Sequence, residues 1–264
     1  MSPRTWKAAV LGALSLGLMV GLASATPSPD GVVVIERVFN DCPLSTFTSV
    51  NNYPAEIDFS DVGNNCYGWA NLHVWRFADG GVPAVFNNNS AFRFSATLVV
   101  DGNGQGESGL QISPWWSQNV DGRVNIRTTD GEIACWGGRL PFYSYTATDG
   151  LHYVKGQPIG IEMTYLPNGL SSVSPATIQY KIVYGGVTYL SPVLPFDEGN
   201  PAEGYGTWGM LNDGRVGGHL QPLWSLGGDP FATVTAVWTD VTFQNLDQVG
   251  TEQTTWGGVK DLYK

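Results

Sequence analysis

The sequence has few of the residues on which most metal sites and thiol or imidazole chemistry depend. Its 264 residues include only 3 cysteines and 3 histidines. None of the cysteines belongs to a C-x-x-C pair, and no serine stands in a G-x-S-x-G setting. The sequence therefore shows no zinc or redox motif and no nucleophile elbow, and we expect neither a metal ion nor a serine-hydrolase triad.

Basic residues are also scarce. The chain has 13 Lys and Arg against 23 Asp and Glu, which gives a formal net charge of −10. No basic cluster interrupts this acidic background. Because nucleic acids and anionic membranes attract basic surfaces, the composition argues against nucleic acid as a partner.

Long apolar runs are absent after the first 25 residues, so we expect no membrane span. Residues 1–25 have the layout of a secretory signal peptide. Arg4 and Lys7 precede a short apolar run over residues 8–22, and Ala23-Ser24-Ala25 follows as a cleavage site. The sequence thus predicts a secreted protein, extracellular or at the cell surface.

The three cysteines fit such an oxidising compartment. We expect a disulfide between Cys42 and Cys66, which both precede the clearest strands. Cys135 lies within a strand-like stretch, and we expect it to be a small buried residue rather than a reactive thiol.

Short stretches of alternating apolar and polar residues dominate the rest of the chain. This alternation predicts β-strands, because successive side chains of a strand point to opposite faces. Asp-Gly and Gly-Gly pairs between the stretches favour tight turns. The clearest alternation spans residues 91–100, 158–166 and 176–184, and residues 32–39 and 232–246 are expected, less clearly, to form the first and last strands.

We therefore predict an all-β fold, an antiparallel β-sandwich or jelly roll, as a single domain over residues 26–246. Residues 40–90 are rich in asparagine and look irregular, so long N-terminal loops are expected there. Residues 247–264 form a C-terminal tail, in which Trp256, Val259 and Tyr263 are spaced for one side of a short helix.

Residues 109–136 place a polar, aromatic face opposite the apolar one. Alternation separates the adjacent tryptophans, with Trp116 on the side of Leu110 and Ile112 and Trp115 on the other side. If the successive strands are antiparallel, one face carries the predicted ligand-binding residues Gln111, Trp115, Arg123, Asn125, Arg127 and Trp136. Such a face suits a polysaccharide, because aromatic rings stack on sugars and polar groups bind hydroxyls. The alternative is a set of ordinary cross-strand ion pairs.

Two carboxylates are the best candidates for catalysis. Glycosidases place two carboxyl groups across the bond that breaks, and Glu132 and Glu162 both belong to strand-like stretches. A second acidic cluster occurs in Glu56-Ile57-Asp58-Phe59-Ser60-Asp61. The oxygen donors Asp101, Asn103 and Glu107 resemble the start of a calcium loop, although Ile112 stands where that loop needs a bidentate acid. A glycine-rich hairpin tip is the alternative there.

The pattern resembles the concanavalin A-like lectin and glucanase superfamily. The resemblance covers roughly residues 32–246 and lies in the block FRFSATLVVDGNGQGESGLQISPWW and in the closing strand VTAVWTDVTFQNL. It implies a jelly-roll sandwich, and the superfamily includes lectins, carbohydrate-binding modules, glucanases and lyases. EIDFSD is similar to the glucanase signature E-x-D-x-(x)-E but carries Asp61 in place of its last glutamate. The tail is similar to a short sorting or anchoring tag of secreted bacterial proteins.

Three functions remain open at this stage. The first is carbohydrate binding through the polar face. The second is a structural or self-associating extracellular protein without a small ligand, whose aromatic residues form core and interface. The third is cleavage of a glycan by a glycosidase or lyase that uses a carboxylate pair.

Overall fold

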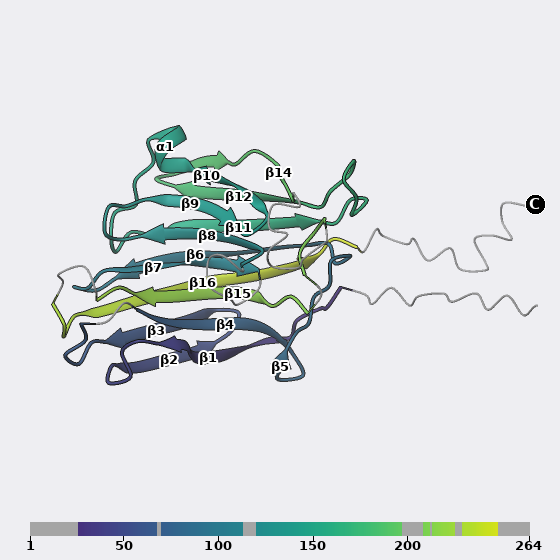
Figure 1. Ribbon diagram of the computed structural model, residues 1–264. Coiled ribbons are helices and arrows are strands. Elements are labelled where there is room, and N and C mark those ends of the chain that lie inside the picture. The colour runs from purple at the N-terminus through teal and green to yellow at the C-terminus, as the bar shows by residue number, and fades with distance from the viewer. Residues whose placement is uncertain are drawn as a thin grey trace, which may run out of the picture.

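The computed structural model describes residues 26–67, 70–112, 120–196, 208–211, 213–224 and 229–247. In this part of the chain nearly all regular structure is β-strand, arranged in two antiparallel sheets that face each other (Figure 1). The predicted all-β sandwich is therefore confirmed. Residues 1–25 and 248–264 lie outside the described residues, so the signal peptide and most of the tail stay predictions.

Sheet A has the strand order β1-β4-β15-β7-β8-β9-β10, and β5 pairs with β4. Its strands are β1 (Gly31–Asn40), β4 (Asn71–Asp79), β5 (Val82–Pro83), β7 (Gly106–Ile112), β8 (Gly122–Arg127), β9 (Ile133–Gly137), β10 (Leu140–Ser144) and β15 (Val216–Pro222). A short helix, α1 (Tyr145–Asp149), follows β10, and its first turn is capped by the Ser144 side chain.

Sheet B has the order β13-β12-β11-β6-β16-β3-β2, and β14 pairs with β12. Its strands are β2 (Thr46–Asn52), β3 (Glu56–Val62), β6 (Phe92–Asp101), β11 (Ile159–Leu166), β12 (Thr177–Tyr184), β13 (Val187–Leu190), β14 (Leu194–Pro195) and β16 (Thr233–Asn245). The three clearest expected strands correspond to β6, β11 and β12, and the expected first and last strands correspond to β1 and β16.

The expectation of long loops over residues 40–90 is wrong. This region contains β2, β3, β4 and the two-residue β5. The residues of β2 are mostly exposed, and almost all residues of β4 are buried. A strand that is solvated or buried on both faces shows no clear alternation in its sequence, so the expected pattern was missing.

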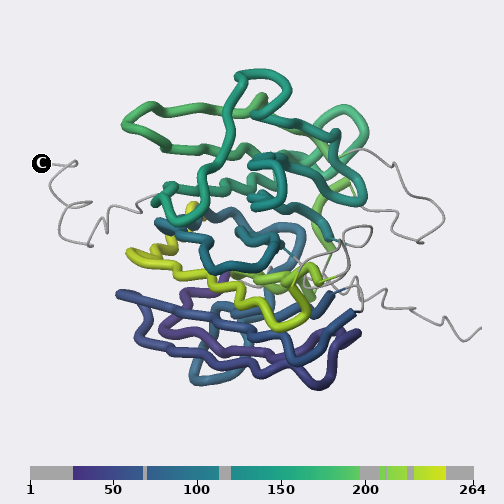
Figure 2. Tube along the Cα trace, turned by 90° about the vertical axis from the view of Figure 1, so that its left-hand side faces the viewer, coloured from purple at the N-terminus to yellow at the C-terminus, as the bar shows by residue number. Residues whose placement is uncertain are grey.

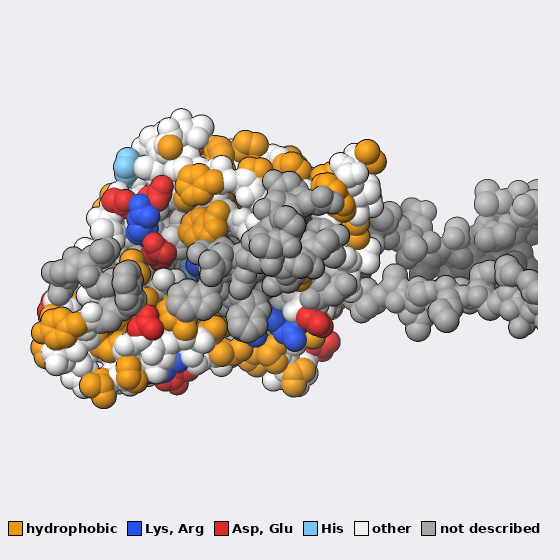
Figure 3. All heavy atoms as spheres, viewed as in Figure 1, with side chains coloured by type: hydrophobic (Ala, Val, Ile, Leu, Met, Phe, Trp, Pro, Cys, Tyr) orange, Lys and Arg blue, Asp and Glu red, His pale blue; other side chains and the backbone are white. Residues whose placement is uncertain are grey.

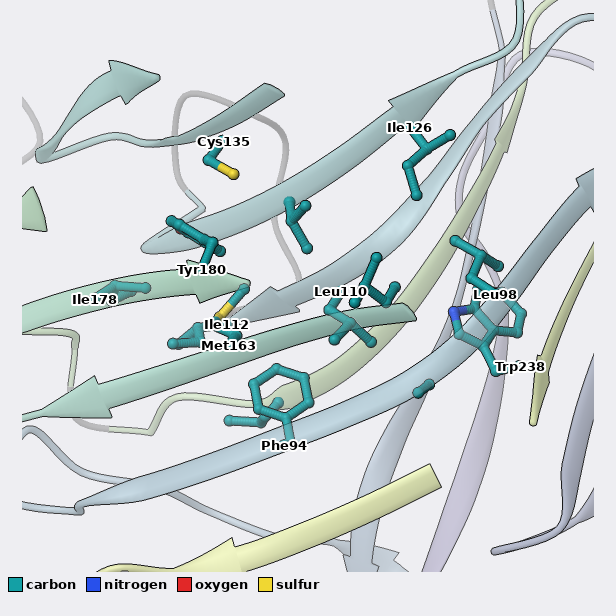
Figure 4. Close-up of a cluster of buried hydrophobic side chains, with 14 of the residues drawn as sticks. Phe94, Leu98, Leu110, Ile112, Ile126, Cys135, Met163, Ile178, Tyr180 and Trp238 are labelled. Carbon is teal, nitrogen blue, oxygen red and sulfur yellow. The ribbon is translucent and has the colours of Figure 1, made fainter. Parts of the chain in front are cut away.

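The core lies between the two sheets. Alternate residues of each strand point inward, and their side chains meet in one large apolar cluster. In Figure 4, Leu110, Ile126 and Cys135 of sheet A approach Leu98, Met163 and Trp238 of sheet B. Cys135 is fully buried and unpaired, which agrees with its expected structural role.

Strands from distant parts of the sequence form the middle of both sheets. In sheet A, β15 lies between β4 and β7, and in sheet B, β16 lies between β3 and β6. Figures 1 and 2 show the early strands at one end of the sandwich and β10, β12 and β14 at the other. Both ends of the described chain leave from the same side, where Asn245 Nδ2 donates to Thr26 O at 3.0 Å.

Asp121-Gly122 is one of the Asp-Gly pairs expected from the sequence to form a tight turn, and this prediction is wrong. Gly122 is the first residue of β8 and pairs in register with Ile112 at the end of β7. A Cβ atom on Gly122 would lie 2.5 Å from Ile178 Cδ1 of the facing sheet, so a larger residue there would displace the Ile178 side chain. The Asp121 carboxylate is buried and forms an ion pair with Arg139 at 2.6 Å.

The expected disulfide joins Cys42 and Cys66, whose Cα atoms are 5.6 Å apart. Both cysteines are buried in a small cluster with Trp224. The adjacent polar network ties the disulfide to the strands, because Asn71 Oδ1 accepts from Cys42 N at 3.0 Å and Asn71 Nδ2 donates to Asp61 Oδ2 at 3.2 Å. Asp61 also contacts buried His73 at 2.7 Å.

Reduction of this disulfide is expected to lower the free energy of unfolding by about 3 kcal/mol, because an unlinked loop of this length gains entropy in the unfolded chain. Guanidinium unfolding with and without dithiothreitol measures the change. The Cys135→Ala variant is the control and should keep the same dependence on reductant. A midpoint that does not move on reduction would contradict a stabilising bridge.

Candidate functional site

The outer face of sheet A, the face turned away from the core, carries three rows of side chains in register across the strands. One row crosses β4, β15, β7, β8 and β9. The next row is more apolar at its edges and polar at its centre. The three rows are Arg76-Gly217-Gln111-Arg123-Trp136, Val74-His219-Gly109-Asn125-Ala134 and Gln221-Glu107-Arg127.

A groove of about 580 Å³ runs over part of this face. Its lining combines aromatic rings, carboxylates, arginines and amides. These residues are Phe39, Leu72, Glu107, Arg123, Asn125, Arg127, Glu132, Ala134, Trp136, Gly137, Gly138, Phe142 and Gln221. On the side of the molecule seen in Figure 3, basic and acidic side chains lie beside each other, and hydrophobic side chains are exposed on the same side.

Most of the predicted ligand-binding residues share this face. Arg123, Asn125, Arg127 and Trp136 line the groove, and Gln111 is hydrogen-bonded to Arg123. Trp115 lies outside the described residues, so its predicted role stays untested. The exposure of the face differs from the expectation, because Gln111, Arg123 and Asn125 are buried.

Arg123 is the largest polar side chain of the groove floor. Its Nη2 donates to Gln111 Oε1 at 2.7 Å, and its guanidinium lies 5.8 Å from the centre of the Trp136 ring. Burial lowers the pKa of Arg123 to about 10, and the Glu107 carboxylate opposes this effect. The guanidinium therefore stays charged at neutral pH, and its Nε–H, which is buried, has no partner among the described residues.

Asn125 connects His219 with Glu107. Its Oδ1 lies 3.0 Å from His219 Nε2, and its side chain also hydrogen-bonds the Glu107 carboxylate. Because the amide oxygen only accepts, His219 Nε2 carries the proton, and Nδ1 is left as a buried acceptor without a partner among the described residues. Burial and the nearby Arg123 hold the pKa of His219 well below its ordinary value, so this ring is neutral.

Gly109 makes room for this network. It stands between His219 and Asn125 in the same row. A Cβ atom on Gly109 would lie 1.9 Å from Val124 O and 3.3 Å from His219 Cε1. No side chain fits there, and the His219 ring occupies the space.

The acidic end of the groove is organised around Arg127. Its guanidinium bonds Asp130 at 2.8 Å and 2.5 Å and Glu132 at 2.7 Å. Burial raises the pKa of Glu107, and Arg123 and Arg127 partly oppose the shift. Glu107 and Glu132 thus line the same groove, and Glu107 holds its proton more tightly than an ordinary carboxyl group does.

The predicted pairing of Glu132 with Glu162 is wrong. Glu162 belongs to β11 of sheet B and points outward there, since its neighbours Ile161 and Met163 are in the core. It bonds Lys181 at 2.7 Å and lines a separate hollow of about 930 Å³. The core therefore separates the two carboxylates, and they cannot act on one bond.

The calcium donors expected in the sequence do not converge. Glu107 lines the groove, and Asn103 Oδ1 accepts from Thr233 N at 2.7 Å. The carbonyls of Gly102 and Gly104 accept from the Lys155 ammonium at 3.1 Å and 2.6 Å. The Lys155 ammonium thus occupies the hairpin that contains Asp101. In the described part of the chain, no group of three or more His, Cys, Asp or Glu side chains is placed to hold a metal ion.

Sequence reasoning missed several groove residues. Glu107 was assigned to the calcium loop, and His219, which lies within β15 and contacts the groove residue Asn125, was not expected at the site. The alternation of Val216, Gly218 and Leu220 could have revealed this strand, but its glycines hide the pattern. Gln221 was missed with the rest of β15, and Phe142 carried no signal because β10 has only five residues.

Comparisons with known proteins give only distant structural resemblances. No family model and no curated protein matches the sequence. Among solved structures, an alginate lyase from Klebsiella pneumoniae has a TM-score of 0.46 and 9% identity, over 76% of this chain and 85% of that one. An alginate lyase from Pseudomonas aeruginosa has a TM-score of 0.45 and 14% identity, over 75% and 85%.

A carbohydrate-binding module from Bacillus subtilis has a TM-score of 0.40 and 12% identity, over 82% of this chain and 97% of that one. At these identities its function has to be argued from its own groove. Among the helices of the described residues, none is long and apolar enough to cross a membrane.

Replacement of Glu107 by glutamine is expected to stabilise the protein at neutral pH. The folded chain keeps the Glu107 proton above the ordinary pKa of 4.5, so it binds more protons than the unfolded chain in that range. Stability therefore falls as the pH rises through this window, and the variant lacks that loss.

Urea unfolding between about pH 4.5 and about pH 7 measures the difference, which should grow with pH. The control is Glu36→Gln, which removes an exposed carboxylate of β1 outside the groove. If the free energy of unfolding depended on pH in the same way for wild type and for Glu107→Gln, the raised pKa of Glu107 would be contradicted.

Proposed function

We propose that the protein binds a polysaccharide in the groove on the outer face of sheet A. The observation that carries the proposal is the composition of the groove lining. It places Trp136, Phe142 and Phe39 beside Asn125, Gln221 and charged side chains. Sugar rings present apolar faces to aromatic groups and hydroxyls to amides and carboxylates. The aromatic and the polar residues of the lining could therefore both contact a bound sugar.

The size of the groove agrees with this proposal. Its volume of about 580 Å³ lies within the usual range for ligand sites. Phe142 is 65% exposed, so an aromatic surface stands free at the groove. Such a lining is suited to several consecutive sugar units.

The polar floor is already held in place before a ligand arrives. Gln111 positions Arg123, and Asn125 holds both His219 and Glu107. Groups that are fixed in advance lose little conformational entropy on binding. This arrangement favours recognition over the alternative of cross-strand ion pairs that serve stability alone.

We also propose that the protein acts outside the cell. The disulfide between Cys42 and Cys66 supports this, because such bonds persist in oxidising compartments. The signal peptide expected at residues 1–25 is the second support. Self-association of the chain stays a prediction.

The Trp136→Ala variant is expected to bind a recognised polysaccharide about tenfold more weakly, because it loses a stacking surface and the partner of Arg123. A glycan array identifies ligands of the wild type, and calorimetry measures the change. Phe231→Ala is the control, since Phe231 is an exposed aromatic outside the groove lining. Equal weakening by both variants, or no binding by wild type, would overturn the proposal.

Cleavage of the bound glycan is a second candidate function, favoured by the raised pKa of Glu107. A carboxyl that stays protonated can donate to a leaving oxygen, and Glu132 lines the same groove as a second carboxylate. The pair available for catalysis is therefore Glu107 with Glu132, in place of the pair expected from the sequence.

If the protein is such an enzyme, Glu107→Gln should lower kcat by about a hundredfold or more while polysaccharide binding remains. New reducing ends without an unsaturated product would indicate hydrolysis, and ultraviolet absorbance of an unsaturated end would indicate elimination. Glu36→Gln again serves as the control and should keep full activity. Intact polymer after long incubation with binding-competent wild type would exclude catalysis.

A further inference from the structure

Arg76 is a half-buried arginine that forms no ion pair within the described part of the chain. It lies on β4 in the first row of the outer face of sheet A. Its Nε–H is buried and makes no hydrogen bond with any described residue. Over the described ranges, no carboxylate lies within ion-pair distance of it, whereas four other arginines, Arg37, Arg93, Arg127 and Arg139, each pair with an acid.

Arg215 brings a second positive charge to the same place. It immediately precedes β15, and its Nη1 donates to Asp213 O at 2.7 Å and Gly214 O at 3.3 Å. These bonds hold the guanidinium without neutralising it. Burial, and next the charge of Arg215, lower the pKa of Arg76 to about 10.

Two neighbouring cations with no described acid between them require an explanation. Partial burial of a charge is unfavourable unless a partner compensates it, and like charges repel. The chain carries 23 acidic residues, yet none of those described pairs with either arginine. An anion supplied from outside would remove both penalties.

The position of the two arginines connects them with the groove. The row continues from Arg76 through Gly217 and Gln111 to Arg123. At the usual strand spacing, three steps place the Arg76 and Arg123 backbones about 14 Å apart. Gly217 has no side chain to obstruct this path, and a Cβ atom there would lie 1.9 Å from Trp75 O.

We propose that Arg76 and Arg215 bind the carboxylate or sulfate group of an acidic polysaccharide whose chain continues along the row toward Arg123 and Trp136. This proposal rests on the proposed function of the groove and narrows its ligand to a polyanion. Guanidinium groups recognise carboxylate and sulfate oxygens through paired, charge-assisted hydrogen bonds. A local cationic site also offsets the repulsion between a polyanion and an acidic protein.

The test measures affinity for three polymers by calorimetry and affinity electrophoresis. Polygalacturonate carries carboxylates, dextran sulfate carries sulfates, and dextran is neutral. Wild type should bind at least one of the charged polymers more tightly than dextran, and added salt should weaken that binding. Tighter binding of polygalacturonate or of dextran sulfate identifies the anionic group.

Arg76→Gln and Arg215→Gln should each weaken binding of the charged polymer about tenfold and leave dextran unaffected. Arg76→Lys keeps the charge and should retain part of the affinity. Arg93→Gln is the matched control, because Arg93 lies on sheet B and should not matter. Thermal unfolding confirms that each variant is folded.

Unchanged affinity of folded Arg76→Gln and Arg215→Gln for the charged polymers would overturn the anion site. The proposed function would still stand if Trp136→Ala weakened binding in the same experiment. If Trp136→Ala had no effect while Arg76→Gln lost binding, the groove would fail and the cationic site alone would remain. Equal binding of charged and neutral polymers by wild type would also count against the anion site.

Discussion

Burial of one face of each sheet sets the register of the strands and, through the register, the make-up of the outer faces. Leu110, Val124 and Cys135 enter the common core from three neighbouring strands. The residues before and after each of them in its strand must therefore point outward. A shift of one residue in β8 would move Arg123 into the core and Val124 into the groove. The energy of the core therefore maintains the outer face, although none of the described residues that line the groove belongs to the core cluster.

The outer face of sheet A departs from an ordinary solvated strand surface. Its central polar residues are buried, and they satisfy one another across three strands through Gln111, Arg123 and Asn125. Buried polar groups are usually hydrogen-bonded. His219 Nδ1 and the Arg123 Nε–H are exceptions, because neither has a partner among the described residues. The balance of charge also changes across the face, from the acidic surroundings of Arg127 to Arg76, which no described carboxylate pairs with.

The local pattern of strands was well predicted by the sequence where one face is apolar. β6, β11 and β12 alternate clearly, and the grouping of Arg123, Asn125 and Arg127 follows from the same rule. The prediction failed where alternation is absent, as in exposed β2 and in buried β4. Glycine-rich β15 was missed for a related reason. A glycine has no side chain whose polarity could indicate whether its position faces the core or the solvent.

Alternation by itself determined the all-β class, the core side of each regular strand and much of the candidate binding face. It could not decide which strands share a sheet, because that depends on contacts between distant segments. Glu132 and Glu162 satisfied the same local rule, yet tertiary structure placed them on opposite outer faces of the sandwich. Only the insertion of β15 between β4 and β7 brought His219 to Asn125 and Arg215 to Arg76. A local sequence pattern determines which side of a strand faces the core, whereas only long-range pairing determines which strands lie next to it.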